Sequence, residues 1–331
     1  MTKQILAVLI LILAAISAKA QKPEYQVQFQ GIGDNREFTH EYNYPQTILG
    51  ESTSVELGTT IDSLHRFRIG ISHLFEFGSE ADAVKPKLTA YYRFQDDKNT
   101  FYFGAFPRME VIDFPLAMLT DTFQYYRPNI EGLYGKHQWS WGHQLGFVDW
   151  TSRQTMTQRE TFMAGLSGEM RFGKFYVQNY LLMFHYALTA AENPDEHITD
   201  NMGYTLYLGY NFAELTGLKQ AYLKVGYMGS SIRERGIDDG FQTGGSFTGQ
   251  LYGEGKRFAL RSTFSFGDGH HFMNGDRYYA QDSYVRTDVI WKFLQYKNIQ
   301  GHFNLSFHLV DGSTLDQQQQ LSLIYKFGNA N

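Results

Sequence analysis

Residues 301–310 read GHFNLSFHLV, and residues 317–327 read QQQQLSLIYKF. In the first stretch Phe303, Leu305 and Phe307 alternate with polar residues, and the second stretch continues the pattern up to Phe327. An alternation of period 2 predicts a β-strand with one apolar and one polar face. A length of about ten residues suits a strand that crosses a bilayer at a tilt.

The same unit recurs along the chain, in about sixteen segments. The sixth, seventh and ninth alternate weakly, and Asn179 interrupts the apolar row of the ninth. Connections after even-numbered segments are short, whereas those after odd-numbered segments are mostly long: 32–53, 76–86, 107–128, 151–160, 187–203, 229–245 and 267–283. We therefore predict an all-β fold, a closed antiparallel transmembrane β-barrel of about sixteen strands with short periplasmic turns and long extracellular loops. A pair of soluble β-sandwiches would also alternate, but gives no reason for every second connection to lengthen.

The N-terminus predicts export. Lys3 precedes an apolar run over residues 5–16, and Ala18-Lys19-Ala20 fits the small residues of a cleavage site. Residues 1–20 are therefore predicted to be a secretory signal peptide cleaved near Ala20, and residues 21–331 a single barrel domain in the outer membrane of a Gram-negative bacterium. A 16% share of aromatic residues with a mean hydropathy of −0.38 suits a sheet with one ring-rich face and one wet face.

The polar row predicts the chemistry of the lumen. A ring of about sixteen strands is too wide for side chains to fill, so it encloses water. The basic residues on this row are Arg66, Arg68, Lys87, Arg93, Arg171, Lys224, Arg257, Arg261, Arg286, Lys292 and Lys326. They outnumber the acids Glu56, Glu169 and Asp288, which predicts a lumen that prefers anions. The alternative is that some of these bases lie at strand ends, facing solvent or lipopolysaccharide.

The loop 107–128 carries Glu110, Asp113 and Asp121 beside the apolar run FPLAML of residues 114–119. An apolar segment on an external loop favours burial, and the channel mouth is the nearest shelter. In this layout the chain resembles the general bacterial porins, in which the loop between strands five and six folds inward. The resemblance implies that the three loop acids face wall arginines, here Arg66, Arg68 and Arg93, and that the protein forms a trimer.

Other patterns predict less. His270 and His271 with Asp276 suggest a metal site, but adjacent residues on an extended chain point apart. Asp149, Ser152 and His143 invite a hydrolase interpretation without a strained nucleophile motif. Four further tyrosines could stack on sugars or anchor the barrel at the interface: Tyr125, Tyr126, Tyr278 and Tyr279.

We therefore predict a passive channel for small hydrophilic solutes, preferring anions or acidic sugars and narrowed by the loop 107–128. It would not be an enzyme, and would need no cofactor or metal. Its partners would be outer-membrane lipid and lipopolysaccharide, the solutes, the barrel-assembly machinery and other copies of itself, but not nucleic acid. The alternatives are an outer-membrane hydrolase of the lipase or protease type, and a surface-binding or structural barrel plugged by its loops.

Overall fold

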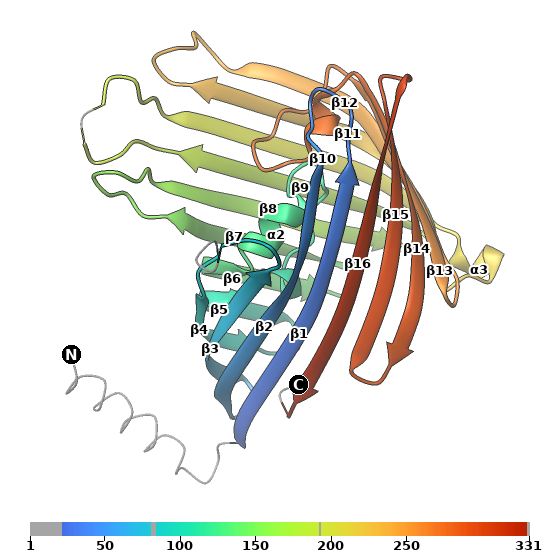
Figure 1. Cartoon of the computed structure of the whole chain (residues 1–331). Coiled ribbons are helices and arrows are strands. Elements are labelled where there is room, and N and C mark those ends of the chain that lie inside the picture. The colour runs from blue at the N-terminus through green and yellow to red at the C-terminus, as the bar shows by residue number, and fades with distance from the viewer. Residues whose placement is uncertain (1–21, 81–83, 192, 330–331) are drawn as a thin grey trace.

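The computed structural model describes residues 22–80, 84–191 and 193–329, so the predicted signal peptide lies outside the described residues. Within them, antiparallel strands form one closed barrel (Figure 1). The strands are β1 (Lys22–Glu37), β2 (Gln46–Ile61), β3 (His65–Glu76), β4 (Lys87–Gln95), β5 (Asn99–Pro107), β6 (Asn129–Trp139), β7 (Gly142–Ser152), β8 (Thr161–Phe172), β9 (Phe175–Tyr186), β10 (Thr199–Asn211), β11 (Gln220–Glu234), β12 (Gln242–Glu254), β13 (Phe258–Gly267), β14 (Ser283–Tyr296), β15 (Ile299–Val310) and β16 (Thr314–Gly328). The predicted fold class and strand count are confirmed.

The barrel closes where its first and last strands meet. β1 pairs with β16 in antiparallel register, with Val27 opposite Phe327 and Ile32 opposite Ser322. No strand in the described ranges is left as a free sheet edge, because every strand pairs on both sides. Closure satisfies the backbone N–H and C=O groups of all strands, which hydrocarbon requires. The alternative of two sandwiches is therefore wrong.

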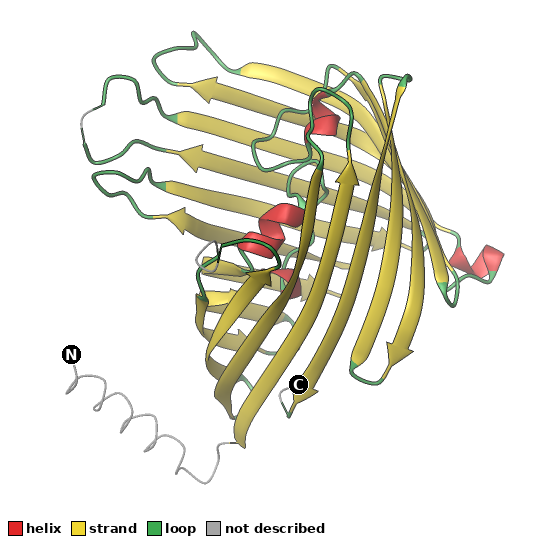
Figure 2. Ribbon diagram, viewed as in Figure 1, coloured by secondary structure: helices red, strands yellow, loops and turns green. Residues whose placement is uncertain are grey.

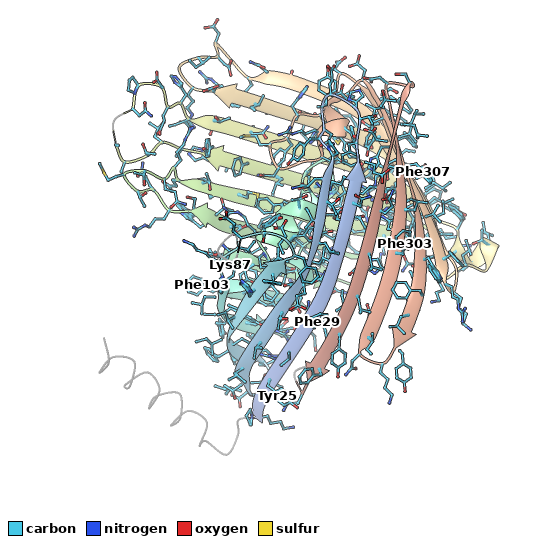
Figure 3. All side chains as sticks on the ribbon, in the orientation of Figure 1. Tyr25, Phe29, Lys87, Phe103, Phe303 and Phe307 are labelled. Atoms are coloured by element: carbon cyan, nitrogen blue, oxygen red, sulfur yellow. The ribbon has the colours of Figure 1, made fainter. Side chains whose placement is uncertain are left out.

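The two faces of the wall are inverted relative to a water-soluble protein. On β16 the apolar side chains of Leu321 and Tyr325 are 46% and 41% exposed, whereas Asp316 and Gln318 are 1% and 4% exposed. Figure 3 labels further aromatic side chains of this outer face, among them Phe29 and Phe303. Such a wall suits lipid outside and polar groups within. Among the described helices, none has the length and apolar character needed to cross a membrane.

Short turns join most strands at the barrel end where β1 begins and β16 ends, with 212–219 as a longer link, and longer loops join most strands at the opposite end, where only 311–313 is brief (Figure 1). The strands extend further than predicted at the long-loop end. The loop predicted over 32–53 shrinks to 38–45, and that over 229–245 shrinks to 235–241. The added strand residues, such as Asp34, Asn35 and Arg36, are polar on both faces, so they lack the apolar alternation of a lipid-facing segment.

The inner wall of β5 to β9 is apolar, which explains the weak alternation of the sixth, seventh and ninth segments. Side chains from these strands pack against the loop between β5 and β6 in one cluster: Tyr102, Phe106, Ile130, Tyr134, Leu145, Phe147, Met163, Leu182 and Phe184 from the strands, with Ile112, Phe114, Met118 and Leu119 from the loop. Both faces of these strands meet apolar surroundings, lipid outside and a loop inside. A period-2 pattern is therefore lost.

Candidate functional site

The loop 108–128 lies inside the barrel. It contains the 3-10 helix η1 (Arg108–Glu110) and the helix α2 (Asp121–Tyr126), which Figure 2 shows within the ring of strands. Its base is fixed by Arg108, which is 1% exposed and donates to Asp149 Oδ2 at 2.5 Å and to the Asn129 carbonyl at 2.8 Å. Its apolar run is buried in the cluster described above. The inward fold expected for this loop is therefore present.

The loop acids meet partners other than those implied by the porin resemblance. Glu110 pairs with Lys326 across the lumen at 3.6 Å, and Asp121 Oδ2 accepts from Gln320 Nε2 at 3.0 Å. Arg66 and Arg68 instead pair with Glu24, at 3.3 Å and 2.8 Å. Arg93 lies over the ring of Tyr102 at 6.0 Å. Among the described residues no ion pair joins a loop acid to any of these three arginines, and the expectation that they face one another stays a prediction.

The basic row is largely neutralised. All of its predicted members except Arg257, which lies in a turn beyond β12, are on strands at inner-wall positions. Several have carboxylate partners: Arg171 with Glu169, Arg261 and Arg286 with Asp288, Lys292 with Glu254. Sequence reasoning had not placed five acids on the inner wall: Glu24, Asp34, Asp149, Glu254 and Asp316. These acids were missed because they lie beyond the ends of the predicted strands or were assigned to the wrong face of their strand.

A second loop, 268–282, also folds inward, which the sequence did not predict. It contains η2 (Arg277–Ala280), and it joins the first loop through backbone hydrogen bonds. Thr120 N–H donates to the Asn274 carbonyl at 3.0 Å, and Asp276 N–H donates to the Leu116 carbonyl at 2.8 Å. The two loops together form a plug across the lumen.

The histidines of the second loop do not form a metal site. His270 is 2% exposed and packs above Gly203, and burial lowers its pKa to about 4. The His271 N–H donates to Ser230 Oγ. Among the residues the structure describes, no group of three or more His, Cys, Asp or Glu side chains could hold a metal ion.

The plug separates two lumen cavities. A cavity of about 730 Å³ lies on the short-turn side, and one of about 370 Å³ lies on the long-loop side. Leu116, Asp121 and Arg286 line both. The Asp121 carboxylate and the Arg286 guanidinium therefore lie at the level of the plug, between the two cavities.

The residues of the suspected hydrolase triad are not brought together. Asp149 is bound to Arg108, and Ser152 Oγ donates to the Arg159 carbonyl at 2.7 Å. His143 lines a third cavity of about 320 Å³ near the opposite end of the same strand. Six residues of strand separate His143 from Asp149, a distance of about 20 Å.

A different His–Asp pair lies on the outer wall at the long-loop end. His185 on β9 is directly opposite Asp200 on β10, and His185 Nδ1 is 2.8 Å from Asp200 Oδ1. Arg235 Nε donates to the other oxygen, Oδ2, at 2.6 Å, and this bond raises the pKa of Arg235. Both side chains face outward, because their neighbours Phe184 and Asn201 are buried on the inner side.

The pair belongs to one row of side chains around the outer wall. Trp150 pairs with Phe162, Phe162 with His185, and Asp200 with Arg233. Trp150 and Phe162 stack at 5.1 Å and 16°, and the Phe162 and His185 rings lie 5.0 Å apart. We call Trp150, Phe162, His185, Asp200 and Arg233 the rim row. The rim row could not be found from the sequence, because its residues come from five strands and become neighbours only through the register of those strands.

Comparison with protein families gives one match that spans almost the whole chain. The family model described as Lipid A 3'-O-deacylase-type matches residues 17–330. This description names an enzyme family, so the prediction that the protein is not an enzyme is wrong. No curated protein matches the sequence.

Solved structures with the same fold are outer-membrane barrels. OmpT of Vibrio cholerae is similar in a loop L8 deletion mutant (TM-score 0.59) and in an in-vitro folded trimer form (TM-score 0.56), each 10% identical, covering 93% of this chain and 100% of that chain. OmpF of Salmonella typhi, in complex with daunomycin, has a TM-score of 0.54 at 10% identity, covering 93% of this chain and 98% of that chain. At these identities the likeness shows the fold alone, that of a porin-like outer-membrane barrel.

Proposed function

Since the chain belongs to the Lipid A 3'-O-deacylase-type family, we propose that it hydrolyses an acyl ester of lipid A in the outer leaflet of the outer membrane. The observation that carries this proposal is the outward-facing His185–Asp200 pair of the rim row. An acyl ester of a membrane lipid lies near the boundary between hydrocarbon and headgroups. A base that attacks it must face lipid at that level, and a base in the lumen would not reach it.

The pair supplies general-base chemistry. Asp200 accepts the Nδ1 proton of His185, which leaves Nε2 as the proton acceptor. Nε2 takes a proton from water, whose oxygen bonds to the ester carbonyl carbon. The bond from that carbon to the sugar oxygen then breaks, and the sugar oxygen receives the proton from the imidazolium. The products are a free fatty acid and a sugar hydroxyl, and Arg235 keeps Asp200 oriented throughout.

The flanks of the pair suit the two parts of such a substrate. Trp150 and Phe162 give an aromatic platform on one side, against which an acyl chain can lie. Arg233 on the other side offers a cation to the phosphate groups of a lipid headgroup.

The test is the mass of lipid A extracted from Gram-negative cells that express the full chain. We expect lipid A to lose the mass of one acyl chain with the native protein, and to keep it with His185→Ala or Asp200→Asn. His137→Ala is a matched control, because His137 lies at the opposite end of the barrel wall and contacts Asn99. Unchanged lipid A with the native protein, or equal loss with His185→Ala, would refute the proposal.

A second function is proposed for the lumen: passive passage of small hydrophilic solutes, with a preference for anions or acidic sugars. It is favoured by the two lumen cavities, both of which are lined by Asp121 and Arg286. Planar-bilayer recording tests it, since a conducting lumen gives current steps and a sealed plug gives none. Under a KCl gradient the reversal potential would report anion preference, and Arg66→Glu combined with Arg93→Glu would shift it toward cations.

We also propose the route and surroundings of the protein. Export would remove residues 1–20 near Ala20, and the barrel-assembly machinery would insert the remainder beside lipopolysaccharide. The OmpT form described as a trimer supports a homo-oligomer. Cross-linking of the protein in native membranes would test this.

A further inference from the structure

The larger lumen cavity, here called the chamber, is built like a binding site. It has a volume of about 730 Å³, within the range of small-molecule sites. Its lining reaches the turn Gly173–Lys174 between β8 and β9, at the short-turn end of the barrel. At the other end it is roofed by the two inward loops, through Phe114 and Tyr279 among others. A ligand would therefore enter from the short-turn side, which is the periplasmic side if the barrel is oriented as predicted, and meet the plug at the far end of the chamber.

Tyrosines form one wall of the chamber. Tyr176 and Tyr180 on β9, Tyr207 on β10 and Tyr222 on β11 share the inner face of three neighbouring strands. The rings of Tyr180 and Tyr207 meet at 80° and those of Tyr176 and Tyr222 at 83°. Ring faces of this kind are surfaces on which the C–H face of a sugar ring can lie, and the phenol groups add hydrogen bonding.

Most charges of the chamber already have partners. Asp288 is held by Arg261 at 2.7 Å and by Arg286 at 2.8 Å. Glu169 is held by Arg171 and accepts from Gln178 Nε2 at 2.6 Å. These five groups carry three positive charges and two negative charges, a net charge of +1, and each of them is already in an ion pair.

Lys224 differs from these groups. Its ammonium contacts Gln178 Oε1 at 3.1 Å and lies 4.5 Å from the centre of the Tyr207 ring, and both are neutral. In the part of the chain that the structure describes, no carboxylate lies within salt-bridge distance of it. The charges of Asp113 and Glu169 act on Lys224 without direct contact, so the ammonium keeps room beside the aromatic rings for a ligand that brings its own anion. Asp113 at the roof offers a carboxylate that accepts from ligand hydroxyl groups.

We propose that the chamber binds a sugar carboxylate of one or two rings from the periplasmic side. The ligand carboxylate pairs with Lys224, a ring face lies on the tyrosines, and hydroxyl groups donate to Asp113. This site is distinct from the rim row, because it lies on the inner wall and the rim row on the outer wall. Binding in the chamber depends neither on the proposed hydrolysis nor on the proposed passage of solutes.

Calorimetric titration of the full protein in detergent micelles tests the proposal, with glucuronate, glucose and acetate as probes. We expect glucuronate to bind at least about tenfold more tightly than either glucose or acetate, since only it offers both the ring and the anion. Lys224→Met should remove the advantage over glucose, and Lys224→Arg should retain it. Lys326→Met is the matched control, a lumen lysine outside the chamber lining, and should bind as the native protein does.

Each other result would overturn the proposal. Equal binding of acetate and glucuronate would mean a simple anion site, and equal binding of glucose would mean that Lys224 plays no part. Absence of glucuronate binding to a native protein that still deacylates lipid A would refute the chamber alone. His185→Ala should bind glucuronate normally, so a failure of the proposed hydrolysis would be recognised separately.

Discussion

The Arg108–Asp149 pair gives the sharpest prediction about stability. Both residues are 1% exposed, and they are joined at 2.5 Å where the plug loop leaves the wall. Asp149 Oδ1 also accepts from the Glu131 N–H at 2.9 Å, and Arg108 Nε donates to the Arg127 carbonyl at 2.9 Å. Removal of one partner leaves a buried charge without its counter-ion, at a cost of about 3–5 kcal/mol.

We therefore expect Asp149→Ala to lower the free energy of unfolding by about 3–5 kcal/mol, and Arg108→Met to lower it by a similar amount. The double variant should lose less than the sum of the two, because neither charge is then left alone. Urea unfolding of the barrel in lipid vesicles, followed by tryptophan fluorescence, measures all four free energies. A loss below about 1 kcal/mol in both single variants, or additive losses in the double variant, would refute the buried-pair argument.

Three other predictions concern the plug and the rim. Burial holds the pKa of His270 at about 4, below its ordinary value, so the unfolded state binds a proton that the folded state does not. Stability should therefore be full above about pH 6.5 and fall by about 3 kcal/mol between pH 6.5 and pH 4, whereas His270→Gln should flatten that slope in urea unfolding. Phe114→Ala should cost about 3–5 kcal/mol, because Phe114 is 5% exposed and packs on Phe147 and Tyr180; a cost near zero in thermal unfolding would show that the plug is loose. Arg235→Gln should slow lipid A deacylation less than Asp200→Asn does, because Arg235 only orients the carboxylate; an equal or greater loss in a fatty-acid release assay would contradict this.

The architecture could be predicted because it depends on a local pattern. The period-2 alternation in stretches such as 301–310 indicates which residues face lipid. The alternation of short turns and long loops indicates which end of the barrel is periplasmic and which is extracellular. The inward position of the loop could also be predicted, because burial of Phe114 and its apolar neighbours is favourable. The ends of the strands could not be predicted. Beyond the lipid both faces of a strand are polar, so the apolar–polar alternation stops at residues such as Asp34.

The sites were harder to predict from the sequence, because they depend on strand register and on partners that are distant along the chain. Glu24 neutralises Arg66 and Arg68 across strands, which the charge of a single row does not reveal. The sequence suggested a hydrolase only through residues that are close together along the chain, such as Asp149 and Ser152. His185 and Asp200 become neighbours only when β9 and β10 pair across the loop 187–198. The expectation of a non-enzymatic protein followed from the absence of a strained nucleophile motif in the sequence.

Release of fatty acid from lipid A by the purified protein tests the central claim most directly. In mixed micelles of detergent and lipid A, the native protein should release fatty acid, and His185→Ala should reduce the rate by about 10²–10⁴-fold while His137→Ala leaves it unchanged. The rim row would be excluded as the catalytic site if His185→Ala released fatty acid at the native rate. Absence of release by the folded native protein would contradict the proposed hydrolysis itself.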